Sequence, residues 1–531
     1  MATSSSGGFR AALDDLFPAE RFGDQRALLA GTTTNVVGLV LTVLATFGVN
    51  VLIARVLGRD ALGVVTVTTQ AAFVLAAGAR FGMDMATVRR VAIDVGRGER
   101  DRVRAVVARA ALICVVFSVA VGAAVFAAAA PLGRAFAPGL PGPATEAFRA
   151  AAVALPFAAL VQVYLGGTRG LKIMRHTLFI FWMGQPLAWT ALMVLGWLGA
   201  RTIGVTAYAY AGAWVLATAA AAWVWRRETR GFGDLPPAQG EVGDLLRYGA
   251  PRAPAALLAQ ALFYTDLFVL ARYAVPAEYG VYAAAVRIGQ LLTLFLVSVN
   301  LMFGPFIADL HARGERDRLD RLYKLVTRWI LTATLPILIV LVIVPESALR
   351  LFGEGFAGGR TALLILLAGQ VANVATGSVG FILVMVGRTG WDLVVYAGSV
   401  AFDVLVAVLL IPRFGIEGAA AAGALTLAVS NAARLALVWR FLRIQPFTRS
   451  YLRLLLPAAV SAAAAWAVHT ALRGAAWQLD LLLTALGAAV VYGGFLVAVG
   501  LPEGERRAVR GMARALVHRG GQGTGPGASK E

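Results

Sequence analysis

The chain has 531 residues, of which 59% are apolar and only 15% are charged, and its mean hydropathy is +0.74. Soluble proteins are nearer half apolar and a quarter charged, so this composition excludes an ordinary soluble protein. The net charge of +19 is spread over alternate loops, which argues against a role in binding DNA or RNA.

Apolar stretches of about twenty residues recur along the whole chain, and each can cross a hydrocarbon core of about 30 Å as a helix. This pattern predicts an all-α polytopic membrane protein with about fourteen transmembrane helices. In chain order we expect them at residues 31–54, 61–85, 107–130, 147–168, 177–199, 203–225, 253–274, 280–308, 329–349, 361–386, 392–411, 417–439, 451–472 and 479–500.

The basic residues predict how the chain is oriented. With the N-terminus in the cytoplasm, the cytoplasmic side carries 35 Lys and Arg residues and the outer side carries 10. Because cytoplasmic loops are enriched in these residues, we expect both termini in the cytoplasm of a bacterial inner membrane. Residues 1–30 then form a cytoplasmic segment, 231–252 a cytoplasmic linker and 501–531 a basic cytoplasmic tail.

Three sequence matches indicate an internal duplication. The hexapeptide "RGERDR" occurs at residues 97–102 and again at 313–318, each time in a predicted cytoplasmic loop. "ARVLGRDALGVV" matches "ARYAVPAEYGVY", which aligns Gly63 with Gly280, and "VWRR" matches "VWRF". We therefore predict two six-helix lobes of the same orientation in a pseudo-two-fold arrangement. The N-lobe spans residues 31–230, the C-lobe spans 253–442, and two extra helices occupy 443–500.

The cysteine and histidine residues do not indicate a metal or cofactor site. Cys114 is the single cysteine, so no internal disulfide can form. The four histidines show no metal-ligand spacing. We expect no cofactor and no metal site.

Several segments resemble a known family. "VLIARVLGRDALGVVTVTTQ", "FGMDMATVRR", "DLFVLARYAVPAEYGVYAAAVRIGQLL" and "NLMFGPFIADLHARGE" are similar to bacterial polysaccharide (Wzx-type) flippases. These belong to the multidrug/oligosaccharidyl-lipid/polysaccharide exporter superfamily and are related to the lipid II flippase. The resemblance implies two facing lobes, a central cavity lined by spans 1, 2, 7 and 8, and alternating access for a polyprenyl-diphosphate-linked oligosaccharide.

A cavity for a diphosphate headgroup should be marked by ionisable residues within spans, which are costly and rare there. Arg80, Arg287 and Arg434 meet this criterion. We predict an ion pair between Asp266 and Arg287, which serves either as a plain interhelical bridge or as a site where phosphate competes with the carboxylate. Arg80 either captures the headgroup or snorkels beside Asp84, and Arg434 lies close enough to the inner end of its span to snorkel.

Four further residues are candidates for the site. Asp403 lies near the middle of span 11, where it is either a carboxylate for ion coupling or a buried hydrogen-bonded acid; Asp84 is a second candidate for ion coupling. Asn50 and Asn300 belong to spans expected to line the cavity, although helix–helix hydrogen bonding explains many such residues.

Three functions are weighed on these observations. The first is a flippase for a lipid-linked oligosaccharide, whose partners would be that glycan, membrane lipids, a polysaccharide polymerase and glycosyltransferases. The second is a cation-coupled multidrug or metabolite exporter, which needs an acidic cavity, whereas the candidate charges are mainly Arg. The third is a membrane glycan polymerase, which usually carries a large extramembrane loop or a catalytic acid motif. The chain has neither, so we expect a transporter and not an enzyme.

Overall fold

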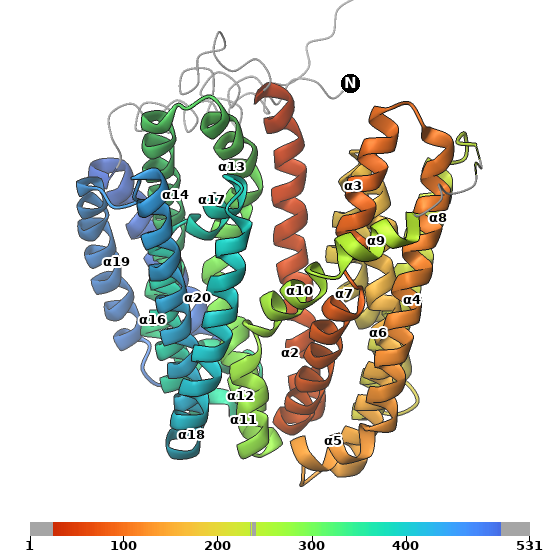
Figure 1. The fold of residues 1–531 in the computed structure, drawn as a ribbon. Helices are drawn as coiled ribbons and strands as arrows, with labels where there is room; N and C mark the ends of the chain where they lie inside the picture. The colour runs from red at the N-terminus through yellow and green to blue at the C-terminus, as the bar shows by residue number, and fades with distance from the viewer. Residues whose placement is uncertain (1–24, 234, 236–240, 501–531) are drawn as a thin grey trace, which may run out of the picture. The chain divides into compact units, whose positions relative to one another are not determined.

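The computed structural model describes residues 25–233, 235 and 241–500, and these residues form helices without a β-strand (Figure 1). Eleven of the described helices are long and apolar enough to cross a membrane, or up to twelve if one bent pair counts as a span. The chain is therefore a multi-pass helical membrane protein, as predicted. Most of the predicted N-terminal segment and the whole basic tail lie outside the described residues.

Two long helices each cover two predicted spans. Helix α2 (Gln25–Ala79) leaves helical geometry at Gly58, where φ is 86°. Helix α18 (Thr389–Leu442) does so at Gly415, where φ is 53°. Glycine adopts positive φ without the steric cost of a side chain, so each glycine separates two helical segments. The count of fourteen spans itself stays a prediction.

Turn-forming residues start several of the other N-lobe helices. Pro141 opens α6, and Thr202 caps α8 by accepting a hydrogen bond of 3.2 Å from the backbone N–H of Val205. Helices α6 and α8 pack side by side (Figure 1). The elements are α3 (Met83–Gly96), η2 (Arg100–Arg102), α4 (Val103–Ala127), α5 (Ala129–Phe136), α6 (Pro141–Gly170), the π-helical η3 (Thr177–Gly184), α7 (Gln185–Trp197) and α8 (Ile203–Glu228).

Besides α18, the following elements form the linker and the rest of the chain. They are α9 (Glu241–Gly249), α10 (Arg252–Ala261), α11 (Thr265–Tyr273), α12 (Pro276–Gly289), η4 (Gln290–Thr293), α13 (Leu294–Ala312), α14 (Arg316–Ile343), α15 (Pro345–Leu349), η5 (Glu354–Gly359), α16 (Arg360–Thr376), α17 (Val379–Met385), η6 (Arg449–Tyr451), α19 (Leu452–Ala471), α20 (Trp477–Phe495) and the π-helical η7 (Leu496–Gly500).

Internal contacts divide the described chain into two compact units. The larger holds residues 35–330 and 345–446, which include most of both predicted lobes. The smaller holds the described parts of 1–34, 331–344 and 447–531. Its core consists of apolar side chains from α14, α19 and α20, among them Val340, Ala465 and Tyr492.

Spans 2, 7 and 8, which carry predicted site residues, are broken helices. Span 2 is interrupted between α2 and α3, and span 8 by the 3₁₀ turn η4 between α12 and α13. Span 7 is interrupted between α10 and α11, where the helix pair Val242–Ala261 and Thr265–Tyr273 is bent by 61°. Irregular backbone at membrane depth is tolerated where it is buried in protein or lines a wet cavity. Arg80, Asp266 and Arg287 all lie at or near these breaks, so the breaks position the predicted site.

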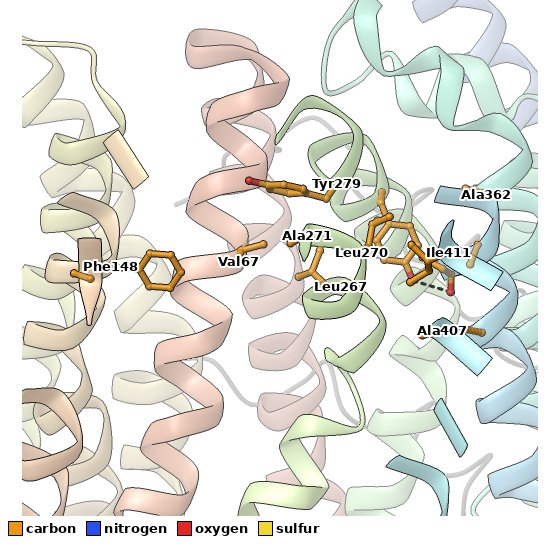
Figure 2. Packing of buried hydrophobic residues seen from close by; sticks show 14 residues of the cluster. Val67, Phe148, Leu267, Leu270, Ala271, Tyr279, Ala362, Ala407 and Ile411 are labelled. Atoms are coloured by element: carbon orange, nitrogen blue, oxygen red, sulfur yellow. Dashed lines mark hydrogen bonds between the residues drawn. The ribbon is translucent and has the colours of Figure 1, made fainter. Parts of the chain in front are cut away.

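A buried apolar cluster joins the two lobes at the predicted outer end (Figure 2). It contains Val67 of α2 and Phe148 of α6 from the N-lobe, with Leu270 of α11 and Tyr279 of α12 from the C-lobe. The Tyr279 hydroxyl also donates a hydrogen bond of 3.0 Å to the backbone oxygen of Phe136. Packing of this kind excludes water from the contact between the lobes.

Gly63 and Gly280, which the repeat alignment made equivalent, let the lobes touch at this end. A Cβ atom on Gly280 would lie 2.1 Å from the backbone oxygen of Arg59, and one on Gly63 would lie 2.3 Å from that of Pro276. Nearby, the Arg55 Nε donates a hydrogen bond of 2.8 Å to the backbone oxygen of Leu351. The two lobes are therefore closed against each other at the predicted outer end.

Candidate functional site

Arg80 lies in the break of span 2. Helix α2 ends at Ala79, and α3 begins at Met83 after two residues with positive φ, Phe81 at 53° and Gly82 at 69°. Positive φ is uncommon for a residue with a side chain, so Phe81 marks a backbone held by its surroundings. Packing explains this, since a Cβ atom on Gly82 would lie 2.9 Å from the backbone oxygen of Gly249. The break thus fits against the end of α9.

The predicted pairing of Arg80 with Asp84 is present. The Arg80 Nε lies 3.7 Å from Asp84 Oδ2, and the two side chains are only 14% and 15% exposed. Asp84 is in the first turn of α3, where the helix dipole favours a negative charge. The Arg80 Nε is buried and has no hydrogen-bond partner in the described structure. Arg80 is therefore held inside the protein rather than extended into the interface.

Sequence analysis missed Arg169, which lies at the end of α6. Arg169 interacts electrostatically with both Asp84 and Arg80, and its Nη1 lies 3.4 Å from the Gln162 side-chain oxygen. We had assigned Arg169 to a loop because it follows the last residue of predicted span 4. The seven-residue spacing from Gln162 places both side chains on one helix face, and this signal could have revealed it. The N-lobe polar centre (Arg80, Asp84 and Arg169) thus holds two cations and one anion.

Arg287 occupies the last turn of α12, just before the 3₁₀ turn η4. Its side chain is half-buried, and its Nη1 donates a hydrogen bond of 3.2 Å to the side-chain oxygen of Gln290. Among the described residues, no carboxylate forms an ion pair with it. Arg287 interacts electrostatically with Tyr210 of α8, which belongs to the other lobe.

The predicted ion pair between Asp266 and Arg287 is wrong. Asp266 instead accepts a hydrogen bond from the Tyr282 hydroxyl. Tyr282 and Arg287 are five residues apart on α12, so their side chains point about 140° apart around the helix axis. A carboxylate that faces Tyr282 therefore cannot also reach Arg287.

Asp266 lies beside Asp403 in the C-lobe. The Asp403 carboxylate interacts electrostatically with Asp266, and the Thr426 hydroxyl donates a hydrogen bond of 2.9 Å to Asp403 Oδ1. Asp403 is 1% exposed. Gly423 leaves space for this arrangement, because a Cβ atom there would lie 2.7 Å from Asp266 Oδ2. We call Asp266, Tyr282, Asp403 and Thr426 the C-lobe polar centre.

No Lys or Arg among the described residues forms an ion pair with either carboxylate of the C-lobe polar centre. Asp403 is buried and Asp266 is half-buried, and two neighbouring carboxylates in such a place cannot both stay charged without compensation. They must share a proton or bind a cation, and the surrounding hydroxyl and carbonyl oxygens are ligands that suit a hard cation. The described residues contain no group of three or more His, Cys, Asp or Glu side chains that could hold a metal.

Arg434 is a buried structural cation. It is 7% exposed, its Nε lies 3.3 Å from Asp392 Oδ1, and its Nη1 donates a hydrogen bond of 2.6 Å to the Ser430 hydroxyl. The guanidinium also lies 4.7 Å from the ring centre of Tyr396. A snorkelling side chain would expose its charge, so that alternative is wrong for Arg434.

The two asparagines differ in their hydrogen bonding. Asn50 is buried, and its side-chain amide donates a bond of 2.7 Å to the backbone oxygen of Thr46, one turn earlier in α2. Asn300 of α13 has a buried side-chain oxygen without a partner in the described structure. Asn300 therefore has a hydrogen-bond acceptor without a partner in the described structure, whereas Asn50 is satisfied within its own helix.

Comparison with known sequences gives one clear match. The model of the polysaccharide biosynthesis protein family matches residues 28–311, more than half of the chain. No curated protein sequence matches it.

Solved structures with a similar fold include the lipid II flippase MurJ in an inward closed conformation. It is 13% identical with a TM-score of 0.69, and the alignment covers 91% of this chain and 99% of that chain. An inward-facing multidrug resistance MATE family transporter of the MOP superfamily is 15% identical with a TM-score of 0.61, covering 76% and 94%. A mutant of the MATE transporter VcmN from Vibrio cholerae is 14% identical with a TM-score of 0.56, covering 78% and 98%.

At these identities the similar structures show the fold, and the sequence match shows the family. Both agree with the resemblance found in the segments around Gly63 and Gly280. The chain belongs to the polysaccharide biosynthesis protein family and has the fold of the MATE transporters and the lipid II flippase.

Proposed function

We propose that the protein is a flippase that moves a polyprenyl-diphosphate-linked oligosaccharide outward across the bacterial inner membrane by alternating access. Family membership supports a role in polysaccharide biosynthesis. The membrane potential, negative inside, favours this direction, since moving two negative charges outward gains about 4–5 kcal/mol per 100 mV. A glycosyltransferase would supply the lipid-linked unit, and a polymerase would consume it.

The excess of cations over anions at the breaks of spans 2 and 8 carries this proposal. Arg287 is half-buried without a carboxylate partner in the described chain, and Arg80 and Arg169 share the single carboxylate of Asp84. An uncompensated Arg within the membrane costs about 2.5–3.5 kcal/mol on insertion scales, so such residues are kept for a purpose. One guanidinium group can donate two parallel hydrogen bonds to two phosphate oxygens, which suits a diphosphate headgroup.

The remaining site residues take supporting roles in this proposal. Asn300, with its free oxygen, binds a sugar hydroxyl near the headgroup, and Asn50 contributes to the same cavity wall. Arg434 and Asp84 stay predictions as substrate-binding and ion-coupling groups, because each has an ion partner within the protein. Asp403 with Asp266 is the better candidate for coupling, since a proton or a metal cation would compensate their charge.

Substitution of Arg287 tests the proposed flippase. We expect Arg287→Ala to lower glycan export in cells at least about tenfold at normal protein abundance, because the headgroup loses a charged hydrogen bond. Arg287→Lys keeps the charge without the paired donors and should retain part of the activity. Arg388→Ala is the matched control, since Arg388 is exposed and stacks on Phe441. Wild-type export by Arg287→Ala at equal abundance would contradict the proposal.

A cation-coupled exporter of drugs or metabolites is the second candidate, and the C-lobe polar centre favours it. Its two carboxylates lack a cationic partner in the described chain, and an acidic site can bind a cationic drug. If this function holds, deleting the gene should raise sensitivity to cationic antimicrobials while glycan export stays intact. The opposite pattern supports the flippase.

A further inference from the structure

The linker helix α9 and helix α3 enclose a pocket of about 530 Å³ at the predicted cytoplasmic end. Figure 1 shows these two helices next to each other. None of the predicted site residues lines the pocket. Its charged lining consists of Arg89, Arg90 and Arg97 from α3 and Arg247 and Asp244 from the linker.

Helix periodicity and packing hold these arginines around the pocket. Arg90 and Arg97 are seven residues apart, which places them on one side of α3 and just past its end, and Arg89 lines the pocket from about 100° around the helix. Leu245 is 4% exposed and anchors α9. The Arg89 guanidinium lies 5.1 Å from the ring centre of Tyr248, so an aromatic face fixes the position of one cation.

The pocket has an excess of positive charge. Four guanidinium groups face one lining carboxylate, Asp244. The neighbouring Asp94 is fully buried and lies 3.3 Å from the Arg90 Nε. Burial raises the pKa of the Asp94 carboxyl, and the Arg90 charge opposes that shift. Like charges held together repel each other, and an anion between them relieves the repulsion.

The two copies of the hexapeptide differ in the surroundings of their first arginine, and only the first copy contributes to the pocket. Arg97, the first residue of the first "RGERDR", lines the pocket. Arg313, the first residue of the second copy, instead forms an exposed ion pair of 2.9 Å with Asp309. The same sequence therefore has a neutralised cation in the C-lobe and an available one in the N-lobe.

We propose that this pocket is a second anion site, which binds the phosphate or diphosphate group of a ligand from the cytoplasmic side. The paired N–H groups of each guanidinium can donate hydrogen bonds to two oxygens of one phosphate. A volume of about 530 Å³ exceeds what one phosphate fills and falls in the range of small-molecule sites. A bound anion would bridge the N-lobe to the linker that leads into the C-lobe.

Two sources offer this chemistry, a soluble phosphorylated compound and a lipid headgroup. The first arm of the test measures binding of inorganic diphosphate to the full-length protein in detergent by calorimetry. The second arm measures binding of the protein in nanodiscs to vesicles that contain a lipid phosphomonoester, against vesicles of neutral lipid. The variants are Arg97→Gln and Arg247→Gln, one from each side of the pocket, and Arg313→Gln is the matched control. All three side chains are exposed, so folding should be unaffected, which thermal unfolding checks.

We expect each pocket variant to raise the Kd about tenfold and Arg313→Gln to leave it unchanged. If the pocket variants lose affinity only for inorganic diphosphate, the ligand is a soluble compound. If they lose affinity only for the phospholipid vesicles, the ligand is a lipid headgroup. Unchanged binding by both pocket variants in both arms, or an equal loss in Arg313→Gln, overturns the proposal. Binding at the proposed transport site would be weakened by Arg287→Ala and not by Arg97→Gln, so the two proposals fail separately.

Discussion

The N-lobe and C-lobe polar centres share a construction and differ in charge. Each lies where a predicted span is broken, at Phe81–Gly82 in the N-lobe and before Thr265 in the C-lobe. The N-lobe centre holds two arginines and one carboxylate, whereas the C-lobe centre holds two carboxylates and no described cation. Similar helix breaks therefore carry a net positive charge in the N-lobe polar centre and a net negative charge in the C-lobe polar centre.

The contact between Gly63 and Gly280 shows what stayed alike between the lobes. These equivalent residues still approach each other's backbone at the predicted outer end. Backbone contact there depends only on the absence of a side chain, so it survives while polar residues elsewhere diverge. We infer that closure of the lobes is a shared property, while the chemistry is divided: the N-lobe centre and Arg287 attract an anion, and the C-lobe centre attracts a cation.

The largest expected effect concerns Arg434, which tests whether the C-lobe offers a substrate a second cation besides Arg287. We expect Arg434→Ala to destabilise the protein by about 3–5 kcal/mol, because it leaves Asp392 buried without its partner. Thermal unfolding in detergent and protein abundance measure this.

A double variant provides the control for this prediction. Replacing the pair together, Arg434→Met with Asp392→Leu, removes both charges and should recover most of the stability. If Arg434→Ala is as stable as the wild type and loses export, Arg434 binds substrate together with Arg287.

The second prediction concerns cation binding at Asp403 and Asp266. A cation bound only to the folded protein stabilises it by about 2.7 kcal/mol at a hundred times its Kd. We expect the wild type to gain thermal stability with added Na⁺, or with falling pH if the proton is the ligand. Asp403→Asn and Asp266→Asn should each abolish that gain, because one carboxylate has been neutralised. Asp309→Asn, whose exposed carboxylate pairs with Arg313 far from this centre in the sequence, is the control and should keep the gain. A gain that persists in both site variants would place the cation elsewhere.

The sequence predicted the fold and most of the charged residues of the site, because ionisable side chains within long apolar segments stand out. It did not predict their partners. The sequence predicts that Asp266 pairs with Arg287, whereas Asp266 accepts a hydrogen bond from Tyr282 and its helix α11 packs against α18. Asp403 is far from Asp266 in the sequence, and only the packing of α11 against α18 brings them together. Arg169 was overlooked because α6 continues two residues beyond the predicted end of span 4.

The smallest expected effect distinguishes a site built for binding from one built for stability. Arg169 is half-buried and interacts unfavourably with Arg80, although Asp84 attracts it. Arg169→Met keeps the length of the side chain and removes the charge. We expect it to raise the free energy of unfolding by about 1 kcal/mol, since functional residues are often kept at the expense of stability. The affinity for a short-chain polyprenyl diphosphate, measured by tryptophan fluorescence, should fall about tenfold.

Gln162→Met changes the neighbour of Arg169 without removing a charge and should leave affinity nearly unchanged. Loss of stability together with unchanged affinity in Arg169→Met would mean that Arg169 serves the packing of α6, and the N-lobe centre would then have no excess positive charge to offer an anion.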